Sequence, residues 1–171
     1  VDKFYMGTRF VDEIQSCGEE MARRLFGVEA VDVRPLSGHV ADLITLASLA
    51  KPGDSLLCVS AKNGGYPGIW NQGIPRFLQL RVIGFPFLEK GMNIDVESAE
   101  KTITKRKPST VIFGASLFLF PHPVKKLSEA AREAGAQVAY DGSHVLGLIA
   151  GKQFQQPLRE GASVLFGSTH K

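Results

Sequence analysis

The stretch TVIFGASLFLFPHPVKKLSEAAREAGAQVAYDGSH, residues 110–144, carries the pattern that decides the fold. It begins with an apolar, β-branched run at Thr110–Gly114, continues with helical spacing over Val124–Ala134, and ends with a second apolar run at Gln137–Tyr140. Runs of this length and composition predict strands, and the longer periodic segment predicts a helix. The stretch therefore indicates a βαβ unit, whose two strands lie parallel.

The same alternation extends through the rest of the chain. Further strands are predicted at Ala30–Val33, Ser55–Val59, Gln79–Phe85 and Ser163–Phe166, and further helices at Phe10–Phe26, Val40–Ala50 and Asp95–Lys105. Short apolar strands that alternate with helices of this length are typical of an α/β fold. We expect three layers, with a mostly parallel sheet that carries helices on both faces.

The composition is that of a globular chain with room for one sizeable core. Of the 171 residues, 44% are hydrophobic and 22% are charged. The 20 basic and 17 acidic residues are spread along the chain, so no block of like charge indicates nucleic acid or an anionic membrane as partner. No apolar run is long enough to span a bilayer.

The cysteines and the chain ends give further expectations. Cys17 and Cys58 have no second cysteine or histidine at zinc-ligand spacing, so we predict no metal site and a reducing, cytoplasmic setting. The chain starts at Val1 without a methionine and stops on Thr169-His170-Lys171, after an apolar run. We therefore expect it to be a piece of a longer polypeptide.

Polar loops follow the predicted strands. They are Ser37-Gly38-His39, Asn63–Gly68, Gly114-Ala115-Ser116, Asp141-Gly142-Ser143-His144 and Ser168-Thr169-His170-Lys171. Ligands of open α/β sheets bind beyond the carboxyl ends of the strands, so these loops are expected to converge on one site.

Together these loops offer the groups that a pyridoxal phosphate site requires: an anion cradle, a carboxylate, a stacking group and a lysine amine. Ser37 and Gly38 open a helix, whose N-terminus favours a phosphate. Asp141 would keep the pyridine nitrogen protonated, and His144 would lie beside the ring oxygen. Lys171 would form the Schiff base.

Each of these residues also has a simpler explanation when taken singly. Ser37-Gly38 could be an ordinary helix N-cap, Asp141 could cap the turn that follows it, and a lysine after a strand is usually solvated. The prediction of a pyridoxal phosphate site therefore rests on the occurrence of all these residues together. The Asn63–Gly68 loop lacks Gly-x-Gly-x-x-Gly, and no Walker-type loop is present, which argues against the common nucleotide-binding motifs.

Several segments resemble, in order, motifs of the serine hydroxymethyltransferase family of fold-type I pyridoxal phosphate enzymes. They are Phe4–Asp12, Ser-Gly-His-Val-Ala-Asp at 37–42, Gly64-Gly65-Tyr66, Gly114-Ala115-Ser116, Asp141–Ala150 and Thr169-His170-Lys171. The resemblance covers essentially the whole chain. It implies that residues 1–171 form an incomplete cofactor-binding large domain, that a small C-terminal domain lies outside this chain, and that the protein is a homodimer.

The resemblance also implies roles for individual residues. It implies that Ser37, Gly38 and His39 bind the phosphate and that Tyr66 stacks on the cofactor ring. Ser116 and His144 would lie on the side of the ring oxygen, and Asp141 would bind the ring nitrogen. Lys171 would form the Schiff base with Ser168 and His170 beside it, and Tyr5 would be a tyrosine of the substrate site. His39 stands where the family has serine or threonine, and Tyr66 where histidine is common. Ile69 replaces a second histidine of that loop, and Arg9 replaces a glutamate.

The reaction that the resemblance implies is cleavage at the Cα–Cβ bond of a β-hydroxy amino acid, with serine converted to glycine and the one-carbon unit passed to tetrahydrofolate. A folate-independent aldolase or transaldolase is an alternative, favoured by Arg9, Tyr66 and Ile69. An aminotransferase-like enzyme and a catalytically silent scaffold with the same fold also stay open. The catalytic glutamate, the substrate-binding arginine and most of the folate site are expected outside this chain.

Overall fold

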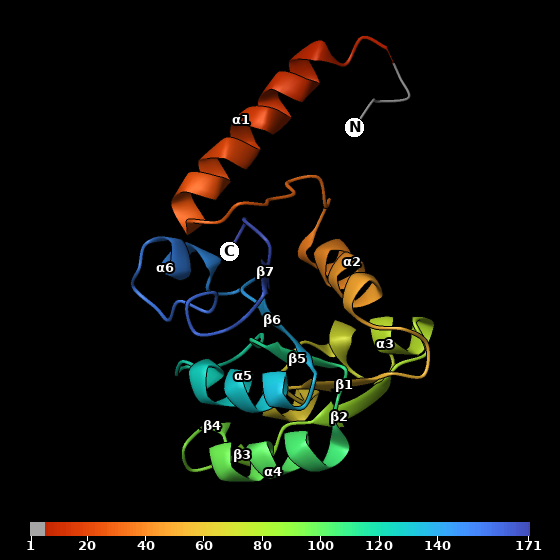
Figure 1. Ribbon diagram of the computed structural model, residues 1–171. Coiled ribbons are helices and arrows are strands. Elements are labelled where there is room, and N and C mark those ends of the chain that lie inside the picture. Colours follow the sequence, from red (N-terminus) through yellow and green to blue (C-terminus); the bar gives the residue numbers. More distant parts are fainter. Residues whose placement is uncertain (1–5) are drawn as a thin grey trace. The chain divides into compact units, whose positions relative to one another are not determined.

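The computed structural model describes residues 6–171 (Figure 1). The chain divides into two compact units, Val1–Leu36 and Ser37–Lys171. The described part of the first unit holds one helix and the segment that follows it. The second unit holds the sheet and every predicted site residue except Tyr5, which lies outside the described residues.

Helix α1, Arg9–Phe26, confirms the helix predicted near the start of the chain. It ends at Gly27, which has the left-handed conformation (φ 66°) and donates its backbone N–H to the carbonyl of Arg23. A left-handed glycine is a common helix terminator because it lacks the Cβ that would clash there. Glu20 forms an ion pair with Arg24 along the exposed helix.

The strand predicted at Ala30–Val33 is wrong, because this segment forms no strand. The Asp32 carboxylate accepts hydrogen bonds from the backbone N–H of Arg34 at 2.9 Å and from its guanidinium at 2.7 and 2.8 Å. A carboxylate that bonds two residues ahead stabilises a local turn in place of a sheet ladder. The apolar residues that suggested a strand are too few to outweigh this bond.

The second unit is built on a five-stranded sheet with the order β2-β1-β5-β6-β7. All four pairings of this sheet are parallel, which confirms the predicted α/β class. The strands are β1 (Ser55–Cys58), β2 (Arg81–Gly84), β5 (Thr110–Phe113), β6 (Gln137–Asp141) and β7 (Val164–Phe166). In this order β5 and β6, the strands of the quoted βαβ unit, are neighbours.

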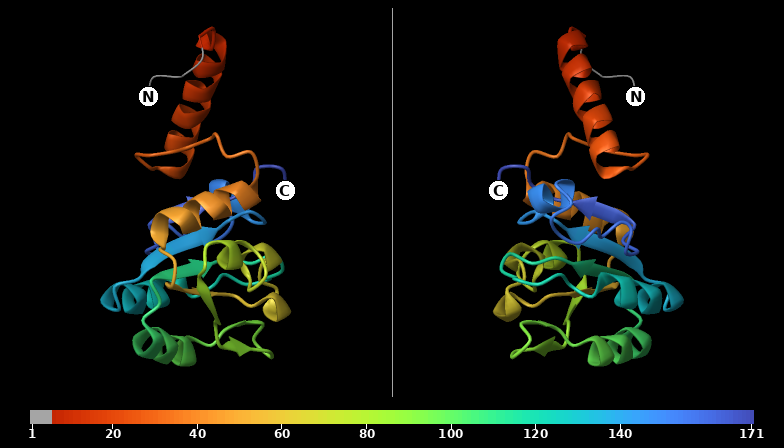
Figure 2. Two further views of the ribbon diagram at one scale, coloured as in Figure 1. Left: turned by 90° about the vertical axis from the view of Figure 1, so that its right-hand side faces the viewer. Right: turned by 90° about the vertical axis from the view of Figure 1, so that its left-hand side faces the viewer.

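Helices cover both faces of the sheet (Figures 1 and 2). One face carries α4 (Val96–Arg106) and α5 (Val124–Glu133), and the other carries α2 (Gly38–Leu49) and α3 (Ile74–Phe77). Helix α6 (Leu146–Ala150) lies between β6 and β7 in the chain, and 3-10 turns occur at Ala61–Asn63 and Pro67–Ile69. The three predicted layers are therefore present.

A small second sheet is present that the apolar pattern did not predict. Strands β3 (Phe87–Leu88) and β4 (Asn93–Ile94) pair antiparallel, with Phe87 opposite Ile94. Two residues per strand are too few to produce a recognisable alternation of polar and apolar side chains. The short helices α3 and α6 were not predicted for the same reason.

The core lies against the central strands. Every residue of β1 and β5 is buried, as expected for parallel strands covered on both faces. The ring of Phe113, the last residue of β5, stacks on that of Phe85, which directly follows β2, with centroids 5.3 Å apart. This packing helps to fix the strand ends from which the polar loops emerge.

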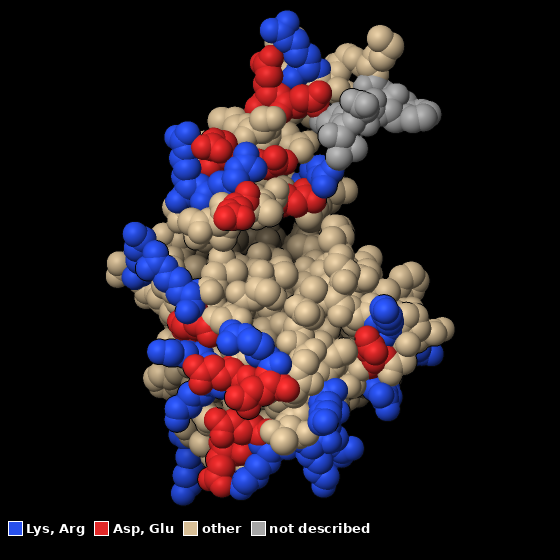
Figure 3. Space-filling view, in the orientation of Figure 1, with Lys and Arg blue, Asp and Glu red and all other residues tan. Residues whose placement is uncertain are grey.

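On the surface, charges of both signs are mixed over α4 and α5, at the lower left of Figure 3. The ion pair between Glu97 and Lys101 is one example. No helix within the described residues combines the length and apolar character needed to cross a membrane.

Candidate functional site

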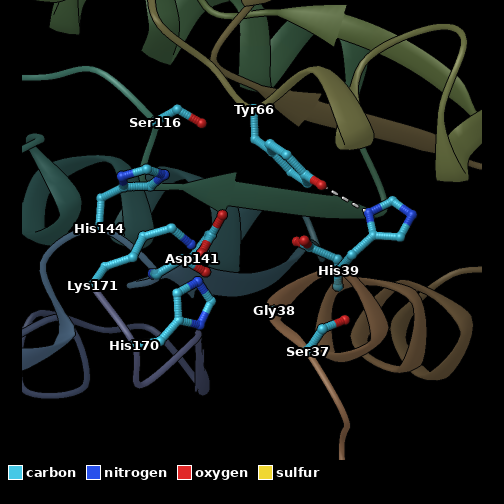
Figure 4. Close-up of a pocket in the computed structure, with 11 residues that line it drawn as sticks. Ser37, Gly38, His39, Tyr66, Ser116, Asp141, His144, His170 and Lys171 are labelled. Carbon is cyan, nitrogen blue, oxygen red and sulfur yellow. Dashed lines mark hydrogen bonds between the residues drawn. The ribbon is translucent and has the colours of Figure 1, made fainter.

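The loops after the strands converge on one pocket (Figure 4). The predicted site residues that line it are Ser37, Gly38, His39, Tyr66, Ser116, Asp141, His144, His170 and Lys171. They come from the start of α2 and from the loops that follow β1, β5, β6 and β7. The expectation that these loops meet at the carboxyl edge of the sheet is confirmed.

One side of the pocket is the N-terminus of α2. Ser37 is the N-cap, and its Oγ accepts a hydrogen bond from the backbone N–H of Val40 at 3.2 Å. A Cβ on Gly38 would lie 3.1 Å from the hydroxyl of Ser143 and 3.4 Å from Cβ of Ser168. Glycine at this position thus lets the helix start close to these loops. The first turn of the helix carries no acidic side chain that would repel an anion. The free N–H groups and the helix dipole favour an anion here.

Asp141 ends β6 and is 5% exposed. Its Oδ1 accepts a hydrogen bond from the backbone N–H of Ser143 at 2.9 Å, which fixes the orientation of the carboxyl group. The loop after β5 approaches closely, since a Cβ on Gly114 would clash with the carbonyl oxygen of Asp141. Gly114 has a φ of 93°, so the position requires glycine on both grounds.

Lys171 reaches the pocket from the loop after β7. Its Nζ donates a hydrogen bond to Oγ of Ser168 at 2.8 Å. Ser168 does not line the pocket itself, but is buried behind the lysine and bonds the carbonyl of Ser143 at 3.4 Å. Ser168 therefore lies next to the Lys171 amine, where the sequence predicted it, and its role there stays a prediction.

Tyr66 and His39 contact each other across the pocket mouth. The phenol oxygen lies 3.0 Å from Nδ1 of His39, and the two rings meet edge to face with centroids 5.9 Å apart (Figure 4). Burial, followed by the charges of Asp42 and Asp141, raises the pKa of Tyr66. Tyr66 therefore remains a neutral phenol, which shares a hydrogen bond with His39.

The remaining predicted residues, Ser116, His144 and His170, line the pocket from three loops. The loop of Ser116 is tied to the loop of Tyr66, because the backbone N–H of Ser116 donates to the carbonyl of Gly64 at 2.9 Å. In Figure 4 the ring of His144 lies beside Ser116, while His170 lies below Lys171.

Two residues of the pocket, Asp42 and Ser143, were not assigned to the site from the sequence. Asp42 lies four residues after Gly38, about one helical turn, so both face the same side of α2. That spacing was the available signal. Ser143 stands inside the Asp-Gly-Ser-His motif, where its backbone N–H rather than its side chain supports Asp141.

A buried polar network holds the loop after β5 in place through the backbone of Gly114. The backbone N–H of Gly114 donates to Nδ1 of His122 at 3.1 Å. The side-chain oxygen of Gln155 accepts hydrogen bonds from the backbone N–H of His122 at 3.0 Å and from the hydroxyl of Tyr140 at 2.9 Å. Burial lowers the pKa of His122 to about 4, so the ring is neutral with its proton on Nε2. This network was not predicted, because its members are far apart in the sequence.

Fold and pocket together define an α/β protein with a polar ligand site at the carboxyl edge of a parallel sheet. In the part of the chain that the structure describes, no three His, Cys, Asp or Glu side chains are grouped to hold a metal ion. The pocket instead combines a helix N-terminus, a fixed carboxyl group and a lysine amine.

Comparison with known proteins identifies the family within this class of α/β proteins. The family model described as serine hydroxymethyltransferase matches residues 1–171. Proteins named serine hydroxymethyltransferase from Methanocaldococcus jannaschii and Thermococcus kodakarensis are 48% and 47% identical to this chain over 169 residues. One from Methanobrevibacter smithii is 43% identical over 170 residues. The chain belongs to the serine hydroxymethyltransferase family, as the resemblance of its motifs predicted.

These alignments cover 99% of this chain and 39% to 40% of each relative. The chain thus spans about two fifths of the length of the curated relatives that it matches.

Proposed function

We propose that this chain is the cofactor-binding part of a pyridoxal phosphate-dependent serine hydroxymethyltransferase. The observation that carries the proposal is the convergence of Lys171, Asp141 and the α2 N-terminus on one pocket. The helix start and the two side chains come from segments far apart in the sequence, and each suits a different part of the cofactor.

The donor set of the pocket fits pyridoxal phosphate. The Ser37 hydroxyl and the backbone N–H groups at the start of α2 would hold the phosphate, with the His39 ring nearby. The carboxylate of Asp141 would bind the protonated ring nitrogen, and the Lys171 amine would bind the aldehyde. We propose that the ring of Tyr66 packs against the cofactor ring, and that Ser116, His144 and His170 contact its edge.

When bound, the cofactor supplies an electron sink for bond cleavage at the substrate α-carbon. The residues of this chain would bind the cofactor and hold it in position. Ser168 orients the Lys171 amine through the bond at 2.8 Å, and the Ser143 N–H keeps the Asp141 carboxyl in place. Fixed groups of this kind lower the cost of reorganisation during the reaction.

Family membership supports serine and glycine as the amino-acid substrates and tetrahydrofolate as the one-carbon acceptor. The test is a steady-state assay of the full-length protein with serine, with and without tetrahydrofolate, and with Lys171→Ala as the inactive control. We expect serine turnover that depends on tetrahydrofolate. Cleavage of threonine without folate use, together with no serine turnover, would support a folate-independent aldolase instead.

We further propose a cytoplasmic homodimer. The two cysteines are unpaired, which suits a reducing compartment. The loop after β5 exposes large apolar side chains, with Leu117 78% and Leu119 70% exposed. Exposed apolar clusters mark interaction surfaces. Sedimentation of the full-length protein should give the mass of two chains, and Leu119→Asp should weaken that association at least tenfold; a monomer at micromolar concentration contradicts the proposal.

A further inference from the structure

The pocket contains a second carboxyl group that the proposed function does not use. Asp42 lies on the second turn of α2 and is 1% exposed, yet it lines the same pocket as Asp141 and Lys171. A buried carboxyl group rarely occurs without a charged partner or a full set of hydrogen bonds. Asp42 therefore requires a physical explanation.

The two carboxyl groups differ in how they are supported. Oδ1 of Asp141 accepts a hydrogen bond from the Ser143 backbone. Oδ1 of Asp42 is buried and has no hydrogen-bond partner within the described residues. An ionised carboxylate in that position would be desolvated, and it would also face the charge of Asp141 in the same pocket.

We propose that Asp42 and Asp141 hold one proton between them at neutral pH and that this proton resides on Asp42. The unsupported oxygen of Asp42 disfavours a charge there, whereas the Ser143 N–H favours the charge on Asp141. Asp141 is then the single negative charge that the pair offers to a ligand.

The electrostatic surroundings of Asp42 agree with this assignment. Burial, and second the charge of Asp141, raise the pKa of Asp42 to about 8, while the nearby Lys171 ammonium acts in the opposite direction. Burial, and after it the charges that Asp42 and Asp141 carry at high pH, raise the pKa of Tyr66, which therefore remains a neutral phenol. The titratable groups that complete the lining of the pocket are His39, His144 and His170.

The assignment predicts how stability depends on pH. Between the ordinary pKa of 3.8 and the raised value of about 8, the folded protein holds a proton on Asp42 that the unfolded chain has lost. The contribution of Asp42 to stability is therefore fully present below about pH 4 and is lost as the pH rises through 8. Asp42→Asn has nearly the same shape, carries no charge and cannot titrate.

The test uses the full-length protein without added cofactor, so that its outcome does not depend on the proposed function. The infrared difference spectrum of wild type against Asp42→Asn at pH 7 should contain the carbonyl band of a protonated carboxylic acid, which disappears as the pH rises above 8. The Tm of Asp42→Asn should equal that of wild type near pH 4 and exceed it by several degrees at about pH 9. Asp54→Asn, at a turn where the carboxylate accepts from the Lys51 N–H, is the matched control and should show neither effect.

The absence of the acid band at pH 7, or Tm curves that run parallel from about pH 4 to 9, would overturn the proposal. A second arm uses 4′-deoxypyridoxine 5′-phosphate, which lacks the aldehyde and so binds without Lys171. Its affinity should fall more in Asp141→Asn than in Asp42→Asn, and the reverse order would also overturn the proposal. If this probe does not bind at all, the proposed function fails while the infrared result still decides the protonation of Asp42.

Discussion

The Nζ of Lys171 donates a hydrogen bond to Oγ of Ser168 at 2.8 Å. Because Ser168 is buried and anchored to the Ser143 carbonyl, this bond fixes the amine relative to the end of β7. A lysine at the end of a loop would otherwise sample many rotamers. The relationship makes Ser168 a positioning residue for the proposed covalent bond.

Ser168→Ala should weaken cofactor binding about tenfold, the equivalent of about 1.4 kcal/mol for one lost hydrogen bond to a charged group. Titration of the full-length protein with pyridoxal phosphate, followed by absorbance, measures the change. Ser163→Ala is the matched control, because its hydroxyl bonds the Val138 carbonyl at the opposite end of β7. Equal losses in both variants would argue that Ser168 is merely structural.

Ser37→Ala should lower both stability and cofactor affinity. Loss of the N-cap bond to Val40 costs about 1 kcal/mol of unfolding free energy, and loss of the hydroxyl removes a proposed phosphate ligand. Asp95 caps α4 in the same way, through the backbone N–H of Ser98. Asp95→Ala should therefore show a similar loss in urea unfolding but an unchanged cofactor affinity, and a drop in affinity there would contradict the assignment.

His122 should make the protein less stable in mild acid. Its folded pKa of about 4 lies below the ordinary value of 6.5, so the unfolded chain binds a proton that the folded protein excludes. The contribution to stability is present above about pH 6.5 and is lost as the pH falls towards 4, by roughly 3 kcal/mol. Urea unfolding at a series of pH values should show this loss in wild type and a flatter profile in His122→Asn. Identical slopes would mean that the ring is not held neutral.

Tyr66→Phe should separate the contribution of the Tyr66 hydroxyl group to cofactor affinity from the contribution of its aromatic ring. The variant keeps the aromatic face but loses the bond to His39 at 3.0 Å, so we expect a fall in cofactor affinity of about threefold. Tyr66→Ala removes the ring as well, and we expect a loss of at least tenfold. Fluorescence titration distinguishes the two. If the alanine variant binds as tightly as the phenylalanine variant, the ring does not pack on the cofactor.

Much of the fold could be predicted because its central strands, β1, β5 and β6, are almost entirely buried. Thr110–Phe113 and Gln137–Tyr140 are continuous apolar runs, and the parallel sheet follows from their alternation with helices. Ala30–Val33 has a similar composition but forms no strand, since the Asp32 carboxylate stabilises a turn with Arg34. Short-range hydrogen bonds of this kind are not visible in apolar periodicity.

The site was predictable to the extent that it follows strand ends. Asp141 ends one apolar run and Lys171 lies in the loop that follows another, so topology alone brings them to one edge. Asp42 lies inside a helix, and in the sequence it looks like any polar residue of a helix. Its burial depends on loops from distant parts of the chain. The same holds for His122 and Gln155, which meet only in the folded protein.

The most direct test of the central claim, that Lys171 binds the cofactor, is mass mapping of the full-length protein after incubation with pyridoxal phosphate and reduction with borohydride. We predict a single pyridoxyl adduct on the peptide that contains Lys171, and its loss in Lys171→Ala. An adduct on a different lysine, or no adduct with excess cofactor, would contradict the account.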